Sequence, residues 1–259
     1  MKITKDNKRI VLQALDERTK LNVLEVAELI GASVATARRL CVKLEEEGHV
    51  IRTFGGIQAK NSKNFSYSFI ASASTCTKEK TAIGNRAALE VMNGDYIFLD
   101  SGTTVLAMAK ALVQRIKEEK LEKIKIVTNS LILTDLLMPY CKIILIGGEI
   151  RPERMDTCGV MAENMLKHLH VQKAFLGCDA LNLERGLMTT DERTARINEI
   201  VINNASSIYI LADATKIGKT SFISYGDLNI IDAYIVDNSI PPDIATILYT
   251  LVKKLIIAE

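Results

Sequence analysis

The stretch SVATARRLCVKLEEEGHVIRTFGG, residues 33–56, decides the fold of the N-terminal part of this chain. Its apolar residues recur at spacings of three and four, which gathers them on one face of a helix: Val34, Ala37, Leu40, Cys41 and Leu44. Arg39 and Lys43 fall on the other side. Ser33 suits an N-cap, and Gly48 suits the C-terminal stop. The stretch therefore predicts a helix with one packed face and one cationic face.

Two further helices are predicted before it, over residues 6–15 and 23–30, because apolar residues recur there at helical spacing. A tight turn at Gly31 and Ala32 separates the second helix from the third, an arrangement that places the third helix in a DNA major groove. Residues 50–52 predict a strand, and residues 53–56 predict the turn of a β wing. Residues 1–58 are thus expected to form a winged helix-turn-helix domain whose partner is double-stranded DNA.

The side chains expected to contact DNA are polar or basic and lie on the third helix or on the wing: Ser33, Thr36, Arg38, Arg39, Lys43 and Arg52. Arginine can bridge guanine acceptors or a phosphate, and Ser and Thr suit either target, so the base that each would read stays open. Residues 1–60 carry 11 Lys and Arg against 8 Asp and Glu, a modest excess, and three of the acids are Glu45 to Glu47 at the far end of the helix. The alternative is a small helical domain with a solvated charged face.

Composition bounds the class of protein. The chain has 259 residues, of which 48% are hydrophobic and 25% charged, as expected for a globular protein of two domains. No apolar run approaches the ~20 residues that cross a bilayer. The five cysteines form no CxxC pair, and without a recognisable signal peptide we expect reduced thiols in a cytoplasmic protein, with no disulfide: Cys41, Cys76, Cys141, Cys158 and Cys178. His49, His168 and His170 lack ligand spacing, so neither a metal nor a cofactor is expected.

Residues 59–76 are rich in Ser, Asn, Thr and Ala and have no sustained period, which predicts a linker between two domains. Phe65, Tyr67 and Phe69 alternate within this segment, so an edge strand is the alternative.

Residues 77–259 change to short apolar runs separated by helical stretches. Helices are expected at residues 104–116 and 131–137, and strands at residues 96–99, 124–127, 143–146, 174–176, 208–211 and 233–236. Continuous apolar strands that alternate with helices indicate a mostly parallel sheet covered on both faces. The second domain is therefore predicted to be an open α/β domain.

The loop from Asp100 to Thr104 is suited to an anion. It follows one predicted strand and opens a helix, so backbone amides and three hydroxyls can face one phosphate at the helix N-terminus. An ordinary capped turn explains the same residues if the loop is taken alone.

Further polar groups follow other strands, and ligands of open α/β sheets bind beyond the carboxyl ends of the strands. Together they predict a site for a phosphorylated polyol or sugar: Asp100, Ser101, Gly102, Thr103, Thr104, Thr128, Asn129, Gly147, Gly148, Asp179 and Lys216. Each alone is also explained structurally, Asp213 as the cap of a turn and Lys216 as a solvated side chain.

These blocks resemble the DeoR family of bacterial transcriptional regulators over nearly the full length. The N-terminal resemblance rests on TARRL at residues 36–40 and LEEEGHVIRTFGG at 44–56. The C-terminal one rests on IFLDSGTT at 97–104, VTNS at 127–130, IGGEIRP at 146–152, AFLGCDAL at 174–181, GLMTT at 186–190 and LADATK at 211–216. The resemblance implies a repressor of sugar-catabolic genes: a winged helix-turn-helix joined to an effector domain with a fold like that of ribose-5-phosphate isomerase. A phosphorylated sugar would control its operator affinity.

Two positions depart from the family pattern. Leu40 stands where an acidic residue is common, and Ala180 stands where a glycine is common after Asp179.

An isomerase-like enzyme and a scaffold that senses nothing are the rival functions. An isomerase needs a positioned carboxylate to move a proton between carbons. By resemblance, Leu176 replaces the first aspartate of the isomerase DGAD segment, and Asn198 falls where the general base would lie, although Glu192 and Glu199 are near. A regulator is therefore preferred, and because one recognition helix covers few base pairs we expect a homo-oligomer, a dimer or tetramer.

Overall fold

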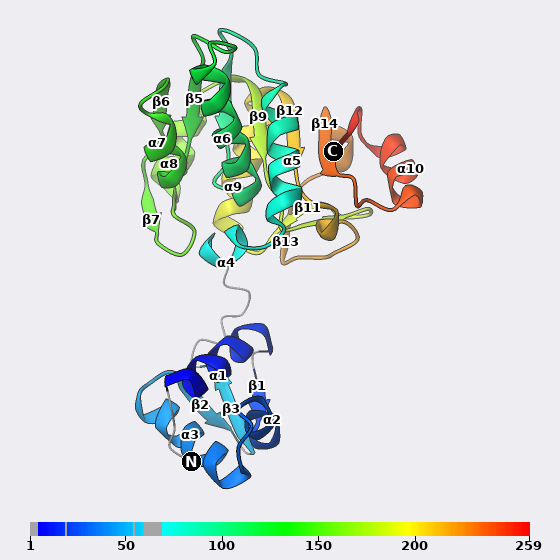
Figure 1. Ribbon diagram of the computed structural model, residues 1–259. Coiled ribbons are helices and arrows are strands. Elements are labelled where there is room, and N and C mark those ends of the chain that lie inside the picture. The colour runs from blue at the N-terminus through cyan, green and yellow to red at the C-terminus, as the bar shows by residue number, and fades with distance from the viewer. Residues whose placement is uncertain (1–4, 19, 54, 60–68) are drawn as a thin grey trace. The chain divides into compact units, whose positions relative to one another are not determined.

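The computed structural model of the chain describes residues 5–18, 20–53, 55–59 and 69–259 (Figure 1). The chain forms two compact units, Met1–Phe65 and Ser66–Glu259.

The first unit is a winged helix-turn-helix, as predicted. Its elements are α1 (Lys5–Arg18), β1 (Lys20–Asn22), α2 (Val23–Leu29), α3 (Val34–Glu46), β2 (Val50–Thr53) and β3 (Gly56–Ala59). The strands form an antiparallel sheet in the order β1-β3-β2. The sequence pattern predicted β2 and the turn that follows it, whereas β1 and β3 are additions, and Thr53 and Gly56 of the expected turn belong to the strands. The core contains Val11, Leu15, Val26, Leu40 and Leu44, all buried.

The ends of α3 follow from local chemistry. Ser33 has an extended backbone, and its hydroxyl accepts a hydrogen bond from the N–H of Thr36. Gly48 has a φ of +79°, a left-handed conformation that glycine adopts without strain, and it ends the helix.

The second unit is built on a seven-stranded sheet in the order β15-β14-β12-β9-β4-β5-β6. Its strands are β4 (Tyr96–Leu99), β5 (Lys125–Thr128), β6 (Lys142–Leu145), β9 (Val171–Leu176), β12 (Ala205–Leu211), β14 (Ala233–Asp237) and β15 (Leu255–Ala258). Every pair of neighbours is parallel. The six predicted strands are all present, and β15 is an addition.

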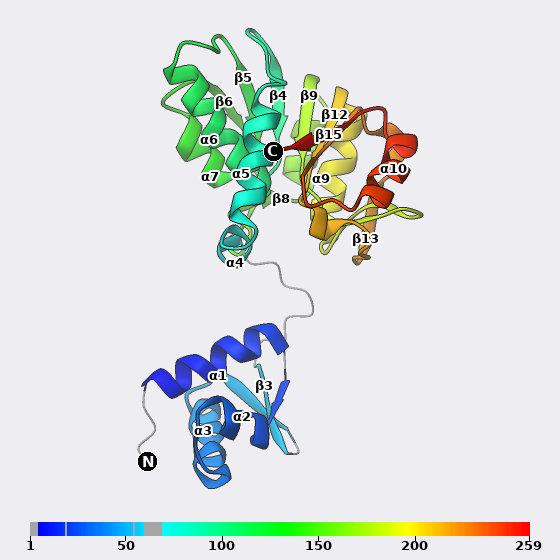
Figure 2. The ribbon, with the colours of Figure 1, turned by 45° about the vertical axis from the view of Figure 1, so that its right-hand side comes forward.

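Helices cover both faces of this sheet, as expected for buried parallel strands (Figure 2). On one face lie α5 (Thr77–Ala88), α6 (Thr103–Lys117) and α7 (Leu131–Leu137). On the other lie α8 (Val160–Leu166), α9 (Glu192–Asn203) and α10 (Pro242–Leu251). Within the described residues, none of the helices has the length and apolar character to cross a membrane.

The order of the strands contains a point where the chain changes direction across the sheet. From β4 the chain continues to β5 and β6 on one side, whereas β9, β12, β14 and β15 continue on the other. The connections that follow β4 and β9 run in opposite directions across the sheet, which opens a crevice at the carboxyl ends of these two strands. Ligands of such sheets usually bind in this crevice.

Two small sheets complete the unit. The hairpin of β7 (Glu149–Arg151) and β8 (Asp156–Cys158) covers the carboxyl ends of β5 and β6, because the N–H of Thr157 donates to the carbonyl of Asn129 (2.9 Å). The second sheet contains β10 (Ala180–Asn182), β11 (Gly186–Thr189) and β13 (Ile223–Gly226). Short 3₁₀ turns lie at Ala214–Lys216 and Leu228–Ile230.

A short helix, α4 (Phe69–Ala73), lies inside the range expected to be a linker. Phe69 is buried, and its N–H donates to the carbonyl of Glu153 (2.9 Å), so the chain is held to the second unit from this residue onward. Phe69 thus begins a helix instead of an edge strand. Residues 60–68, with Phe65 and Tyr67 of the alternating pattern, lie outside the described residues.

Candidate functional site

The exposed side of α3 is cationic. Arg38, Arg39 and Lys43 are exposed along it, Ser33 is exposed at its N-terminus, and Arg52 is exposed on β2. The Nε of Arg39 donates to the carbonyl of Ala35 (3.4 Å), which keeps this side chain along the helix. Five of the six expected DNA-contacting residues therefore lie on the surface.

Thr36 is the exception, because only 5% of it is exposed. It lies four residues before Leu40 and therefore on the apolar stripe of α3, and its hydroxyl is 3.1 Å from that of Ser33. Thr36 therefore supports the N-terminus of the helix from inside.

The acidic end of α3 is used within the domain. Glu47 forms an ion pair with Lys8 of α1, and a carboxylate oxygen of Glu45 accepts the N–H of Arg52 (3.3 Å). The lowered pKa of the exposed Glu47 carboxyl arises from its hydrogen bond with Lys8. These contacts direct the acids towards α1 and the wing.

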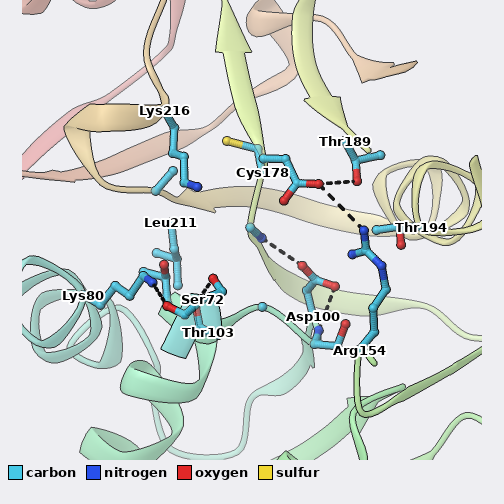
Figure 3. Close-up of a pocket in the computed structure, with 16 residues that line it drawn as sticks. Ser72, Lys80, Asp100, Thr103, Arg154, Cys178, Thr189, Thr194, Leu211 and Lys216 are labelled. Carbon is cyan, nitrogen blue, oxygen red and sulfur yellow. Dashed lines mark hydrogen bonds and ion pairs between the residues drawn. The ribbon is translucent and has the colours of Figure 1, made fainter. Parts of the chain in front are cut away.

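The second unit contains a pocket at the carboxyl ends of β4, β9 and β12, where the chain changes direction across the sheet (Figure 3). It encloses about 560 Å³, counting the space that opens to solvent. It is lined by Ser72, Lys80, Asp100, Ser101, Gly102, Thr103, Thr104, Arg154, Gly177, Cys178, Asp179, Thr189, Thr194, Leu211, Ala212 and Lys216. The polar lining suits a small, charged organic molecule.

Asp100 holds β4 and β9 together at the base of the pocket. Its carboxylate accepts the N–H of Ser101 (2.7 Å) and the N–H of Gly177 (3.1 Å). Burial raises the pKa of Asp100 to about 6, against the opposing effect of these two hydrogen bonds. Asp100 therefore acts on the shape of the loop, and its charge is costly at neutral pH.

Ser101 is also committed within the protein. Its hydroxyl donates to Asp156 (2.8 Å), which is fully buried and forms two hydrogen bonds with the guanidinium of Arg151 (2.8 Å each). Arg151 also contacts Asp191, the N-cap of α9 (2.7 Å). The hydroxyl proton of Ser101 is thus not directed at the pocket, contrary to the expectation that all three hydroxyls of this loop face an anion.

The N-terminus of α6 opens directly into the pocket. Its N-cap is Gly102, which offers no side-chain cap, so the first amides of the helix lack the partner that Ser, Thr or Asp would supply. Thr103 and Thr104 follow, and both line the pocket. An uncapped helix N-terminus next to two hydroxyls is suited to a phosphate.

Three cationic side chains surround this helix end. Lys80 comes from α5, Arg154 from the turn between β7 and β8, and Lys216 from the 3₁₀ turn after β12. Lys80 is 6% exposed, and its ammonium donates to the carbonyls of Ser72 (2.6 Å) and Thr75 (2.9 Å). Burial lowers the pKa of Lys80. A bound anion would compensate this desolvation.

Asp179 also lines the pocket and lies near Arg154. One carboxylate oxygen accepts the hydroxyl of Thr189 and the N–H and hydroxyl of Thr190, all at 2.9 Å. The guanidinium of Arg154 is 3.9 Å from the same oxygen and donates to Thr190 (2.7 Å). The carboxylate is thus held firmly where it can accept a hydroxyl of a ligand.

Four of the expected effector-binding residues do not line the pocket. Thr128 donates its hydroxyl to the carbonyl of Leu99 (2.7 Å), and Asn129 donates to the carbonyl of Thr157 (3.1 Å). A Cβ at Gly148 would lie 2.4 Å from the carbonyl oxygen of Cys158, so this glycine serves the β7–β8 hairpin, and Gly147 precedes it. The hairpin buries Thr128 and Asn129 at the end of β5, whereas Gly147 and Gly148 are exposed on the segment that leads into the hairpin. Asp213 caps the 3₁₀ turn that contains Lys216, which confirms the structural explanation given for Asp213 from the sequence.

Several lining residues have no counterpart among the sequence predictions, above all Lys80 and Arg154. A signal for Lys80 is present, because it lies three, four and seven residues before Ile83, Gly84 and Ala87, on the buried face of α5. A lysine on an apolar stripe is unusual and points to a partner. Arg154 lies in an irregular turn between two short strands, for which the sequence offers no periodic signal.

Fold and sites together define a winged helix-turn-helix transcription regulator with an attached ligand-sensing α/β domain. Residues 8–63 match the model of the DeoR-like helix-turn-helix domain, and residues 75–238 match that of the DeoR C terminal sensor domain. The chain therefore belongs to the DeoR family of DNA-binding transcription regulators.

Individual relatives agree with this assignment. The chain is 33% identical to the HTH-type transcriptional repressor GlcR of Bacillus subtilis (strain 168), over 88% of this chain and 86% of the relative. It is 32% identical to the Lactose phosphotransferase system repressor of Lactococcus lactis subsp. lactis, over 90% of each chain. Among solved structures, ribose 5-phosphate isomerase A of Methanocaldococcus jannaschii matches 53% of each chain at 23% identity with a TM-score of 0.40, a likeness too distant to bear on function. The relatives are named as regulators, not as enzymes.

Proposed function

We propose that the second unit binds a phosphorylated sugar in the pocket beside α6, and that occupancy of this pocket changes the affinity of the winged helix-turn-helix for operator DNA. The observation that carries the proposal is the convergence of the uncapped N-terminus of α6 with Lys80, Lys216 and Arg154 in one pocket. Amides and cations together select a phosphate, because each favours negative charge and the helix end supplies unsatisfied donors.

We propose an orientation for the ligand in the pocket. The phosphate would accept hydrogen bonds from the first amides of α6, from Thr103 and Thr104, and from the two lysines. The sugar would extend towards Asp179, whose carboxylate is oriented by Thr189 and Thr190 to accept a ligand hydroxyl. A sugar without phosphate would lack the negatively charged group that the lysines and the helix amides bind.

The response to the ligand is proposed to be repression of sugar-catabolic genes that a sugar phosphate relieves. One relative is named as the repressor of a lactose phosphotransferase system, which supports this direction. Since helix-turn-helix proteins bind paired half-sites as dimers, we propose a homo-oligomer, a dimer or tetramer. Sedimentation at the concentrations used for DNA binding tests this, and a monomer on and off DNA would contradict it.

A thermal-shift panel tests the ligand. The full chain is heated with phosphorylated aldoses and ketoses, with the same sugars lacking phosphate, and with inorganic phosphate at constant ionic strength. A ligand that binds only the folded state at a hundred times its Kd adds about 2.7 kcal/mol to apparent stability. Lys216→Ala should abolish the shift by a sugar phosphate, and the exposed Lys167→Ala, outside the pocket, should keep it. A shift equal for sugars with and without phosphate would refute the assignment, and no shift with any compound would favour a scaffold.

An isomerase is the second candidate, and the pocket argues against it. Its lining carboxylates among the described residues are Asp100 and Asp179, both already engaged by protein donors. Asn198 is buried on α9 and offers no base, and Glu192 and Glu199 do not line the pocket. We therefore propose that the unit binds its ligand without converting it. Interconversion of phosphorylated aldoses and ketoses by the purified chain, lost in Asp179→Asn, would overturn this.

A further inference from the structure

Helix α4 is held by the residues that would bind the phosphate. The hydroxyl of Ser72 lies 3.2 Å from that of Thr103, and the ammonium of Lys80 donates to the carbonyls of Ser72 and Thr75 at 2.6 and 2.9 Å. Figure 3 shows Ser72, Thr103 and Lys80 together on one wall of the pocket. The polar contacts of α4 thus converge on the pocket, although α4 belongs to the segment that leads in from the DNA-binding unit.

The start of α4 is attached to the opposite wall. The N–H of Phe69 donates to the carbonyl of Glu153, the residue before Arg154, which lines the pocket. Phe69 itself is 5% exposed. A displacement of either pocket wall would therefore move α4. In the sequence, residues 60–68 connect α4 to the DNA-binding unit.

An anion at the N-terminus of α6 would fix the direction of the hydrogen bonds. A threonine hydroxyl has one proton, so if Thr103 donates to the anion, Ser72 must donate to Thr103. Hydrogen bonds in such a chain strengthen one another. Without such an anion, either hydroxyl can be the donor. The anion would therefore tighten the contact between α6 and α4.

Lys80 would act in the same direction. An ammonium has three protons. One is donated to the carbonyl of Ser72 in α4 and one to the carbonyl of Thr75, two residues after α4, which leaves the third for a ligand in the pocket. Burial lowers the pKa of Lys80 and so disfavours its charge, and a nearby anion would favour the charged form. A ligand would therefore strengthen the hold of Lys80 on the carbonyls of Ser72 and Thr75, without competing for it.

We propose that α4 is the coupling element of this regulator: a phosphate group in the pocket clamps α4 through Thr103–Ser72 and through Lys80, and so constrains the chain that carries the DNA-binding unit. Ser72 is thus a positioning residue, and by reciprocity it contributes to the affinity for the anion only as much as it contributes to the coupling. The proposal rests on the anion site proposed above. It differs from it in predicting a variant that still binds the ligand, at most about fivefold more weakly, and that responds poorly even when the pocket is saturated.

Hydrogen–deuterium exchange on the full chain tests the clamp, with inorganic phosphate as the probe and chloride at equal ionic strength as the control. Phosphate should slow exchange in peptides over residues 103–108 and also over residues 69–76. At phosphate concentrations that saturate both proteins, the protection of 103–108 in Ser72→Ala should stay within about twofold, and that of 69–76 should fall about fivefold, the equivalent of one net hydrogen bond. Ser72→Thr keeps the hydroxyl and should restore it. Thr81→Ala removes an exposed hydroxyl that bonds only within α5, and should behave as the unaltered protein.

The outcomes separate the two proposals. Protection of 103–108 without any change over 69–76 leaves the anion site standing and overturns the clamp. Absence of protection in both segments refutes the anion site, and the clamp with it. Equal protection of 69–76 in Ser72→Ala and in the unaltered protein also overturns the clamp.

A DNA measurement tests the consequence for regulation. An operator fragment is selected from random duplex DNA by the full chain, and its Kd is measured with and without the sugar phosphate that gives the largest thermal shift, or inorganic phosphate if none does. Coupling between two sites commonly changes affinity 5–150-fold. At a ligand concentration that saturates both proteins, Ser72→Ala should reduce this factor about fivefold, while the ligand still raises its Tm. Undiminished coupling in this variant would overturn the role of α4.

Discussion

The close packing of α5 against α6 at Gly84 gives a quantitative test of how the pocket is built. A Cβ at this position would lie 2.5 Å from the carbonyl carbon of Ala107, 2.5 Å from the backbone nitrogen of Met108 and 2.9 Å from the Cβ of Ala107. Real Cβ atoms do not approach backbone this closely, and a helix backbone cannot yield locally. In Gly84→Ala the two helices must therefore separate.

The expected cost has two opposing parts. Overpacking in a well-packed core costs about 1–3 kcal/mol, and alanine recovers up to about 1 kcal/mol through its helix propensity. A net loss of about 1–2 kcal/mol corresponds to a fall of about 2–8 °C in the Tm of a unit of this size. Because Lys80 lies one turn before Gly84 on α5, the separation should also weaken binding of sugar phosphate.

Scanning calorimetry of the full chain measures the effect on the transition of the larger unit. Gly147→Ala is the matched control, because no heavy atom lies within 4 Å of a Cβ built there. It should leave this Tm unchanged. A Gly84→Ala protein as stable as the original, or an equal fall in both variants, would refute the reasoning that the α5–α6 contact requires glycine.

Three further variants test the sites. Burial raises the pKa of Asp100 from 3.8 to about 6, so its stabilising contribution is complete below pH 3.8 and is lost as the pH rises through 6. The unfolding free energy of Asp100→Asn minus that of the original protein, both measured in urea, should therefore increase by about 1–2 kcal/mol between pH 5 and 7.5. A difference that does not change with pH would contradict the raised pKa. Arg151→Met leaves the fully buried Asp156 without its cation and should lower the unfolding free energy by about 3–5 kcal/mol. Adding Asp156→Asn to the same chain should restore much of this free energy. If it restores none, the loss came from packing and not from charge. Arg39→Ala should weaken binding to the selected operator. If Arg39 reads a base, the loss should be about 1–3 kcal/mol with relaxed specificity; if it binds phosphate, the loss should be uniform across sequences and the slope of log affinity against log salt concentration should fall by about 1. Unchanged DNA affinity would show that Arg39 is not in the interface.

The DNA-binding unit could be predicted almost completely because its determinants are local. The spacing of Ala37, Leu40 and Leu44 fixes the buried face of α3, and Ser33 and Gly48 fix its ends. The same rule predicts that Thr36 is buried, since it precedes Leu40 by one turn. The small strand β1 escaped prediction because three residues carry too little periodicity.

The sensor domain could be predicted as a class and its pocket only in part. The loop from Asp100 to Thr104 opens the pocket as expected, because a loop between a strand and a helix is a local feature. Thr128 and Asn129 have the same local signature and are buried under a hairpin. Nothing near them in the sequence distinguishes the two cases.

The sequence by itself determined the elements, their buried faces and the anion-suited start of α6, since these depend on residues within a few positions of one another. The tertiary structure decided which loops share a pocket. Strand order places β4 beside β9 and opens a crevice there, whereas the β7–β8 hairpin closes the ends of β5 and β6. Lys80, Arg154 and Lys216, separated by 74 and 62 residues along the chain, meet only because of that order. The ends of parallel strands look alike in sequence, and only packing decides which of them stay open.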